Sequence, residues 1–370
     1  MNKGSHFFKN LDALRFMAFL GVFILHTLPV AEATIHSATA GDYIHSIFSF
    51  YYLGVPFFFS LSSFLITYKL LEEYKQNGKI RLFTFYLKRG LRIWPIYFLL
   101  LLVCFVALPL ISLLLNVEQP SLPDIFPFLF FYANFYMIDH GVGFFAPLLV
   151  LWSVSIEEQF YILWGLVLKF LKKYLVPFIF FLLAGSLIFS YYYLYLNHQS
   201  LRNLKLHSLY AVPDFCIGTL IAIICHRKKG GFNFLAGLPT FTYASVYILL
   251  VGMYVIKTFR VTNLDPILTN LIFAVCYGLI LFDQSFNNRR IFNAGRFFFL
   301  NYLGKISYGL YIYHELAISL MEKLFNFFKP VQPFGKTLLQ AISTLALTIL
   351  IAHLSYRYFE KMFLRMKEKL

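Results

Sequence analysis

Long runs of apolar residues, separated by short charged segments, dominate the chain. Three runs contain no Asp, Glu, Lys or Arg over a length that crosses a bilayer: 96–115, 174–196 and 232–256. A membrane-spanning helix needs about 20 such residues. We therefore expect an all-α polytopic membrane protein with about ten transmembrane helices. They are expected near 11–28, 46–70, 93–115, 153–171, 175–196, 209–225, 234–256, 266–283, 303–322 and 337–356.

The composition agrees with a membrane-embedded chain. Of the 370 residues, 59% are hydrophobic and 13% are charged, whereas soluble domains contain about 25% charged residues. Runs of this length do not fit an outer-membrane barrel, whose strands alternate apolar and polar positions. The four cysteines lie in apolar stretches at no metal-ligand spacing, so we expect neither disulfides nor a metal site. Residues 1–370 are expected to form a single transmembrane domain with no appended soluble domain.

The distribution of Lys and Arg predicts the orientation. With the N-terminus in the cytoplasm, most of the 32 Lys and Arg residues fall on the cytoplasmic side, and 72–92 is the most basic loop. The positive-inside rule then places both termini in the cytoplasm. Because this explains most of the net charge of +15, we expect no nucleic-acid partner. Residues 116–152 are apolar but rich in proline, so we expect an outer-face or re-entrant segment there.

Two ionisable residues interrupt the first apolar run. Arg15 and His26 are eleven positions apart, so on a helix they leave the same face with a rise of roughly 16 Å between them. Ionisable groups inside a span are costly and face a cavity or a partner. Asp12 lies one turn before Arg15, where it can pair with the guanidinium. Alternatively, Arg15 extends to the cytoplasmic headgroups.

A histidine and two carboxylates are expected at a similar depth on different helices. His26 lies near the outer end of the first span, and the fourth span carries Glu157 and Glu158 in its outer part. This combination suits general acid/base catalysis: the imidazole takes a proton from an attacking hydroxyl, while a carboxylate orients the imidazole or holds the acceptor. The alternative is a buried His–Glu pair that only ties two helices together.

Arg89 and Arg92 lie at the cytoplasmic start of the third span. Residues three apart are neighbours on one helical face, and paired guanidinium groups bind phosphates in a bidentate manner. The alternative is ordinary anchoring by positive charge on the cytoplasmic side.

Six motifs follow one another in the order found in the acyltransferase-3 family, which this chain resembles over nearly its whole length. Members of that family are membrane O-acyltransferases that modify bacterial surface glycans. One departure is Ser63, where the family usually has Gly, and we expect relaxed helix packing at that position. The motifs are Arg15-x10-His26, GVPFFFSLSSFLI (54–66), RGLRIWPIY (89–97), WSVSIEEQFY (152–161), PDFCIGTLIA (213–222) and ISYGLYIYHELA (306–317).

The resemblance implies a membrane-bound enzyme of the bacterial inner membrane that takes an acyl group, in the first instance acetyl, from cytoplasmic acyl-coenzyme A. The acceptor would be a hydroxyl of a polysaccharide or lipid-linked glycan at the outer side. In that picture Arg89 and Arg92 meet the coenzyme A phosphates, Arg15 lines the path of the thioester arm, and His26 lies at its far end. Acetyl-CoA is then a co-substrate, and no metal is implied.

Several assignments are weaker. Asp214 and His314 recur in the family motifs, but each is also explained by an interhelical hydrogen bond. Ser153 and Ser155 offer an acyl-enzyme route, yet serines at a helix start are more simply caps, so we favour direct transfer. A transporter of a glycan or lipid-linked sugar is the alternative function; against it, the sequence has no matched half-repeats.

Overall fold

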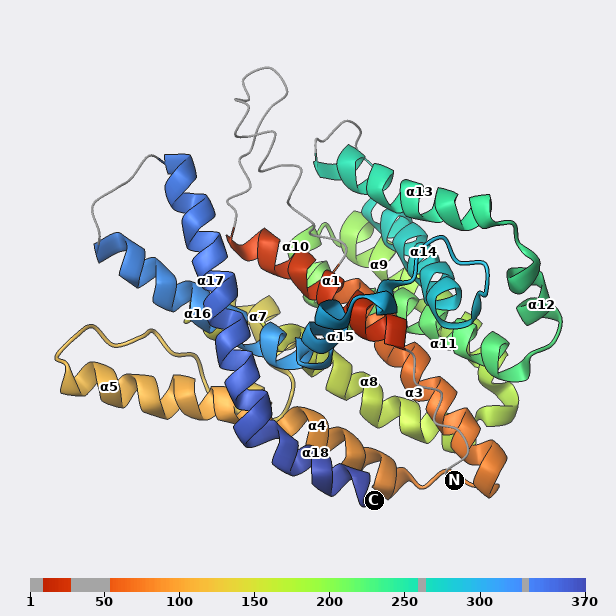
Figure 1. The fold of residues 1–370 in the computed structure, drawn as a ribbon, viewed down its shortest axis with the longest axis horizontal. Helices are drawn as coiled ribbons and strands as arrows, with labels where there is room; N and C mark the ends of the chain where they lie inside the picture. The colour runs from red at the N-terminus through yellow and green to blue at the C-terminus, as the bar shows by residue number, and fades with distance from the viewer. Residues whose placement is uncertain (1–8, 28–53, 259–263, 328–332) are drawn as a thin grey trace. The chain divides into compact units, whose positions relative to one another are not determined.

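The computed structural model describes residues 9–27, 54–258, 264–327 and 333–370, and all regular secondary structure in them is helical (Figure 1). The chain forms two compact units, each built from segments distant in sequence. The first unit contains the described residues of 1–25, 30–72 and 213–307, and the second those of 26–29, 73–212 and 308–370.

The first unit is a helical bundle around one apolar core. Its core gathers side chains from α1, α3, α11, α13 and α14, with Phe64 and Tyr277 among the fully buried ones. The elements are α1 (Lys9–Thr27, through Leu25), α3 (Val55–Asn77, through Glu72), α11 (Val212–Arg227, from Pro213), α12 (Gly230–Gly237), α13 (Thr240–Thr258), α14 (Pro266–Phe286), η6 (Ala294–Arg296) and α15 (Phe298–Lys305).

A glycine brings α3 and α11 unusually close. A Cβ atom added to Gly218 would lie 2.1 Å from the Ser60 carbonyl oxygen and 2.2 Å from Ser63 Oγ. The Ser63 hydroxyl donates to that same carbonyl at 3.0 Å, so it stays on its own helix. The two helices therefore remain in close contact where a serine replaces the usual glycine, and the relaxed packing expected at Ser63 is not observed.

The second unit holds the remaining helices. Its longer elements are α4 (Leu82–Leu102), which continues through η1 (Val103–Ala107) into α5 (Leu108–Leu114), and α8 (Leu151–Phe170), α9 (Leu175–Tyr191), α16 (Ser307–Phe327, from Tyr308) and α17 (Pro333–Ser355). The shorter ones are α6 (Phe126–Leu129), α7 (Ala133–His140), η2 (Ala146–Leu148), η3 (Lys172–Tyr174), η4 (Tyr192–Leu196), α10 (Leu201–Leu206), η5 (Ser208–Ala211), η7 (Tyr356–Glu360) and α18 (Lys361–Glu368).

Hydrogen bonds from buried or half-buried side chains tie α4, α8 and α16 together. The Tyr86 hydroxyl of α4 donates to the Ile162 carbonyl of α8 at 2.8 Å. The Tyr308 hydroxyl of α16 donates to the Ile93 carbonyl of α4 at 3.2 Å. Because each bond satisfies a polar group within an apolar surrounding, these contacts fix the three helices that carry most of the candidate site.

Each expected span contains a helix in the residues that the structure describes. Seven of them are long and apolar enough to cross a membrane, or eight if the bent pair α12–α13 is counted as one span. The helices α8 and α16 are not among these, because they carry polar and ionisable side chains along their length. The described residues are thus all-helical and the chain is a multi-pass membrane protein, while the count of about ten and the cytoplasmic location of both termini stay predictions.

The proline-rich segment 116–152 contains only short helices, the longest of which, α7, has eight residues. None of these helices is long enough to cross a membrane, and the outer-face or re-entrant placement of the segment stays a prediction. The described residues do not include residue 28 of the first expected span or residues 46–53 of the second.

Candidate active site

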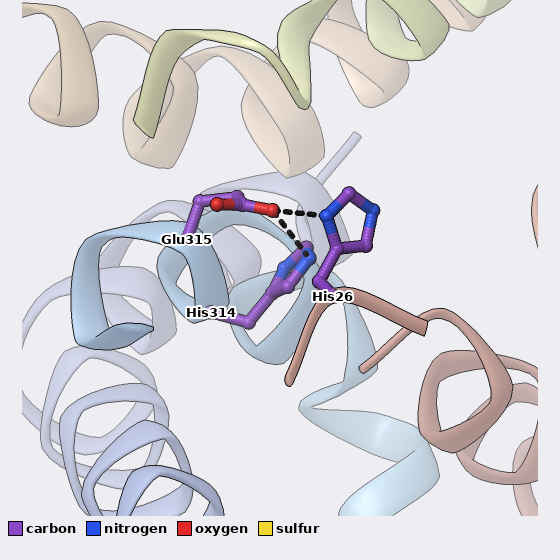
Figure 2. Close-up of side chains that lie close together, drawn as sticks. All are labelled: His26, His314 and Glu315. Atoms are coloured by element: carbon purple, nitrogen blue, oxygen red, sulfur yellow. Dashed lines mark ion pairs between the residues drawn. The ribbon is translucent and has the colours of Figure 1, made fainter. Parts of the chain in front are cut away.

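Three ionisable side chains meet in the second unit (Figure 2). His26 lies in the last turn of α1, whose end belongs to this unit, and His314 and Glu315 are consecutive residues of α16. Successive side chains leave a helix about 100° apart. Both residues of α16 therefore face the end of α1 without any distortion of the helix.

Glu315 connects the two imidazole rings. Its Oε1 atom is paired with Nδ1 of His26 and lies 3.9 Å from Nε2 of His314. The two rings are arranged edge to face, with centroids 5.3 Å apart. Figure 2 shows the carboxylate directed at both rings from one side. The group is therefore a His–Glu–His cluster centred on one carboxylate oxygen.

The pairing with Glu315 selects which nitrogen of His26 is basic. A carboxylate only accepts hydrogen bonds, so Nδ1 of His26 must carry the proton in this contact. In the neutral ring the lone pair is then on Nε2. The His26 side chain is 37% exposed, whereas that of Glu315 is 7% exposed. A buried carboxylate thus orients an accessible imidazole, which is the arrangement of a general base and its orienting acid.

His314 is held firmly on the buried side of the cluster. Its side chain is fully buried, and Nδ1 donates to the Tyr311 carbonyl of the preceding turn at 2.6 Å. A carbonyl oxygen cannot donate, so Nδ1 carries a proton and Nε2 is directed toward Glu315. His314 therefore lines the inner wall of the site, and His26 faces outward.

The three side chains of the cluster also resemble a set of metal ligands. One ligand atom from each of His26, His314 and Glu315 lies within 4.8 Å of the others, and two His with one Glu is a set that Zn²⁺ uses. However, His26 Nδ1 and Glu315 Oε1 are in direct hydrogen-bond contact. That contact needs a proton between the two atoms, so in the structure they are paired with each other.

The two glutamates selected from the sequence lie on α8 and have other partners. Oε2 of Glu157 accepts a hydrogen bond from the Tyr161 hydroxyl at 2.7 Å. Oε2 of the buried Glu158 accepts one from the Trp94 indole of α4 at 3.1 Å. Its Oε1 atom is buried and has no hydrogen-bond partner in the described part of the chain. The carboxylate that pairs with His26 is thus Glu315, which the sequence analysis did not select.

Tyr311 connects the cluster with α8. Its hydroxyl lies 2.7 Å from Ser153 Oγ, in the neighbourhood of the Glu157 and Glu315 carboxylates. Tyr311 and His314 are three residues apart, so they share one face of α16. A series of polar groups therefore extends from the His–Glu–His cluster along α16 to α8.

The arginine pair of α4 lies beside the α8 end of this series of polar groups. The Arg89 guanidinium lies over the Tyr161 ring, with 5.4 Å between Cζ and the ring centroid, and over the Phe85 ring at 5.9 Å. Tyr161 in turn donates to Glu157. Arg92 is half-buried one turn further on, near Glu360. Because aromatic rings hold Arg89 in place, it differs from an arginine that merely extends into solvent.

The remaining candidates have simpler surroundings. Arg15 pairs with Asp12 one turn earlier in α1, as the spacing suggested. Asp214 is buried in α11, and its Oδ1 atom has no hydrogen-bond partner among the described residues. The hydroxyl groups of Ser153 and Ser155 donate to carbonyls of the preceding turn, at 3.1 and 2.9 Å. The prediction that these serines cap α8 is therefore wrong: its cap residue is Val150, with no side-chain cap.

Comparison with known proteins gives a consistent result. A family model described as an acyltransferase domain, that of the acyltransferase-3 family, matches residues 8–357. A putative O-acetyltransferase of Staphylococcus aureus is 27% identical over 98% of this chain and 58% of its own length. The peptidoglycan O-acetyltransferase OatA of Listeria monocytogenes is 26% identical, and the putative peptidoglycan O-acetyltransferase YrhL of Bacillus subtilis 25%, each over 84% of this chain and 50% of its own length. The chain thus spans about half the length of these relatives. No solved structure matches it.

Proposed function

This chain belongs to the acyltransferase-3 family, and on that premise we propose that it transfers an acetyl group to a hydroxyl of a cell-envelope glycan. The names of its relatives, among them peptidoglycan O-acetyltransferases, support a glycan acceptor. The observation that carries the proposal is the pairing of His26 with Glu315 in an accessible position. Family membership favours this function over the alternative of a transporter. No observation on the described residues supports that alternative.

The chemistry proposed for the cluster is general-base catalysis. Nε2 of His26 takes the proton of the acceptor hydroxyl while the hydroxyl oxygen forms a bond with the acetyl carbonyl carbon. The carbon–sulfur bond to the donor then breaks, and the leaving sulfur receives the proton from His26. Glu315 stabilises the imidazolium that exists between these two steps. His314 packs beside Glu315 on the buried side of the cluster.

We propose that the donor is acetyl-CoA from the cytoplasm. The acceptor is then located at the outer side of the bacterial inner membrane. Arg89 and Arg92 would bind the phosphates of the donor, and Arg15 would contact its thioester arm, since two planar guanidinium groups suit phosphates. Glu157 and Glu158 would hold the acceptor. The buried Oε1 atom of Glu158, which lacks a hydrogen-bond partner in the described chain, supports a role in accepting a bond from a hydroxyl.

Release of free coenzyme A tests this function. Purified protein supplied with acetyl-CoA and peptidoglycan fragments should release thiol in proportion to the acetyl groups that appear on the glycan. Trapping the thiol with a chromogenic disulfide measures one product, and mass spectrometry of the fragments measures the other. A transporter would release no thiol. An enzyme that uses a different donor would acetylate the fragments only when that donor is supplied.

Replacing Arg92 by alanine should raise KM for acetyl-CoA about tenfold and leave kcat almost unchanged. Contacts with phosphates remote from the reacting carbon form in the ground state and persist in the transition state, so their loss weakens binding uniformly. Arg92→Lys should restore only part of the affinity, because it keeps the charge but loses the planar fork. Steady-state kinetics at saturating acceptor measure both constants.

The matched control is Arg81→Ala. Arg81 is exposed and immediately precedes the same helix, so its loss removes an equal charge and should leave KM for the donor unchanged. If Arg92→Ala also leaves this constant unchanged, the pair serves only to anchor α4, and the phosphate-binding role is wrong.

A further inference from the structure

An apolar groove runs along α4 on the second unit, between this helix and the segment η7–α18. Its volume is about 690 Å³, and it extends from Phe83 in the first turn of α4 to Leu102 at its end. Phe359 and Phe363 form its other wall. The remaining lining consists of aromatic and aliphatic side chains of α4, together with Gly90 and Pro95, which have little or no side chain to fill the space.

The two polar side chains of the groove donate their hydrogen bonds within the protein and not to an occupant. The Tyr86 hydroxyl donates to the Ile162 carbonyl, and the Trp94 indole donates to Glu158. Both groups are therefore directed into the protein, and what remains toward the groove is hydrocarbon and ring faces. Trp94 is 45% exposed even so. An occupant that fits these walls is a hydrocarbon chain, because it needs no polar partner.

Positive charge lies at one end of the groove. The helix α18 carries Lys361, Arg365 and Lys367 but a single carboxylate, Glu368. Its C-terminal end lies beside the first turns of α4 (Figure 1). Lys367 lies four residues after Phe363, and so on the same helical face as this wall residue.

The first turns of α4 add a further cation. Lys88 lies three residues before Leu91, which lines the groove, so the two are neighbours on the helix surface. These segments are expected to face the cytoplasm, where the membrane leaflet is rich in anionic lipids. An apolar groove that ends in a cluster of cations matches a lipid with an apolar chain and an anionic headgroup.

We propose that this groove binds an acyl chain of one anionic phospholipid, whose headgroup phosphate contacts Lys88 and Lys367. The chain of the lipid lies over Gly90 and Trp94, and the charged headgroup lies at the start of α4. This site is separate from the proposed transfer reaction, and its existence does not depend on that function.

Quenching of Trp94 fluorescence by brominated lipids tests the proposal. The chain has three tryptophans, so Trp152→Phe and Trp164→Phe leave Trp94 as the only reporter. In vesicles, dibrominated phosphatidylglycerol should quench Trp94 at a several-fold lower mole fraction than dibrominated phosphatidylcholine. One cation near the membrane surface contributes about fivefold in affinity for an anionic lipid, so Lys88→Gln and Lys367→Gln together should abolish the preference.

The matched reporter is Phe181→Trp in a chain without other tryptophans. Phe181 is 71% exposed on α9 and does not line the groove, so the two lipids should quench there equally.

If the tryptophan variants do not fold, native mass spectrometry provides a second test. The unaltered chain should retain phosphatidylglycerol, and the Lys88→Gln/Lys367→Gln chain should not. Equal quenching of Trp94 by both lipids would overturn the anionic assignment. Absence of quenching by either lipid would mean that protein, such as a second copy of the chain, covers the groove.

Discussion

Replacing His26 by alanine is expected to lower the rate of acetyl transfer by about 10²–10⁴-fold, the range typical for loss of a general base. The reason is that the alanine variant has no group at this position to take the proton of the acceptor hydroxyl. The effect should appear in kcat, with little change in KM for the donor, because the imidazole acts on the reacting atoms and not on the remote phosphates. Acetyl groups on the glycan, counted by mass spectrometry, measure the rate.

His140→Ala is the matched control for this prediction. His140 is an exposed histidine at the end of α7 in the same unit, stacked on Tyr136, and its loss should leave transfer almost unchanged. Both variants should insert into the membrane and purify like the unaltered protein, since the His26 side chain is also partly exposed. A well-folded His26→Ala protein with nearly normal turnover would show that His26 is not the base.

Replacing Glu315 by glutamine should lower kcat by about two orders of magnitude while KM for the donor stays the same. The amide has nearly the shape of the carboxylate but no charge to stabilise the imidazolium. It also allows its NH₂ group to face His26, which would favour the tautomer with the lone pair on the wrong nitrogen. Glu322→Gln is the control: it lies seven residues later on α16, is exposed, and should have no effect.

The double variant separates positioning from a merely structural role. If Glu315 acts only through His26, His26→Ala/Glu315→Gln should be no slower than His26→Ala alone, because the two residues then form one functional unit. A merely structural Glu315 would instead add its own loss, together with lower thermal stability of the Glu315→Gln protein. Independent effects of the two substitutions on kcat would therefore contradict the assigned role of Glu315.

The helices were predictable because the signal for a membrane helix is local. An apolar run such as 96–115 is recognised without any knowledge of its neighbours, and the structure has one nearly continuous helix there. The same applies to the pair Asp12–Arg15, whose spacing alone brings the side chains together. The helices α8 and α16 were harder to define as spans, because the polar residues that serve the site lower their hydropathy.

The residues of the site are brought together by contacts between segments that are distant in sequence. They could therefore be predicted only in part from the sequence. His26 was visible as an ionisable residue in an apolar run, and His314 as part of a motif. Glu315 was overlooked although it is a charged residue next to His314 in an expected span, a signal that was available. What the sequence could not supply was the packing of the end of α1 against α16, which decides that Glu315, and neither Glu157 nor Glu158, pairs with His26. Tertiary packing also explains Ser63, since the space is provided by Gly218 on another helix.

The most direct test of the central claim is the transfer of radiolabelled acetyl groups in sealed, inside-out membrane vesicles that contain the protein and enclose glycan fragments. With labelled acetyl-CoA added outside, where the cytoplasmic face is exposed, the unaltered protein should acetylate the enclosed glycan, and the His26→Ala protein should give about one per cent of that signal or less. Absence of label on the glycan with the unaltered protein, or equal labelling with the two proteins, would contradict the claim that His26 catalyses acetyl transfer from acetyl-CoA.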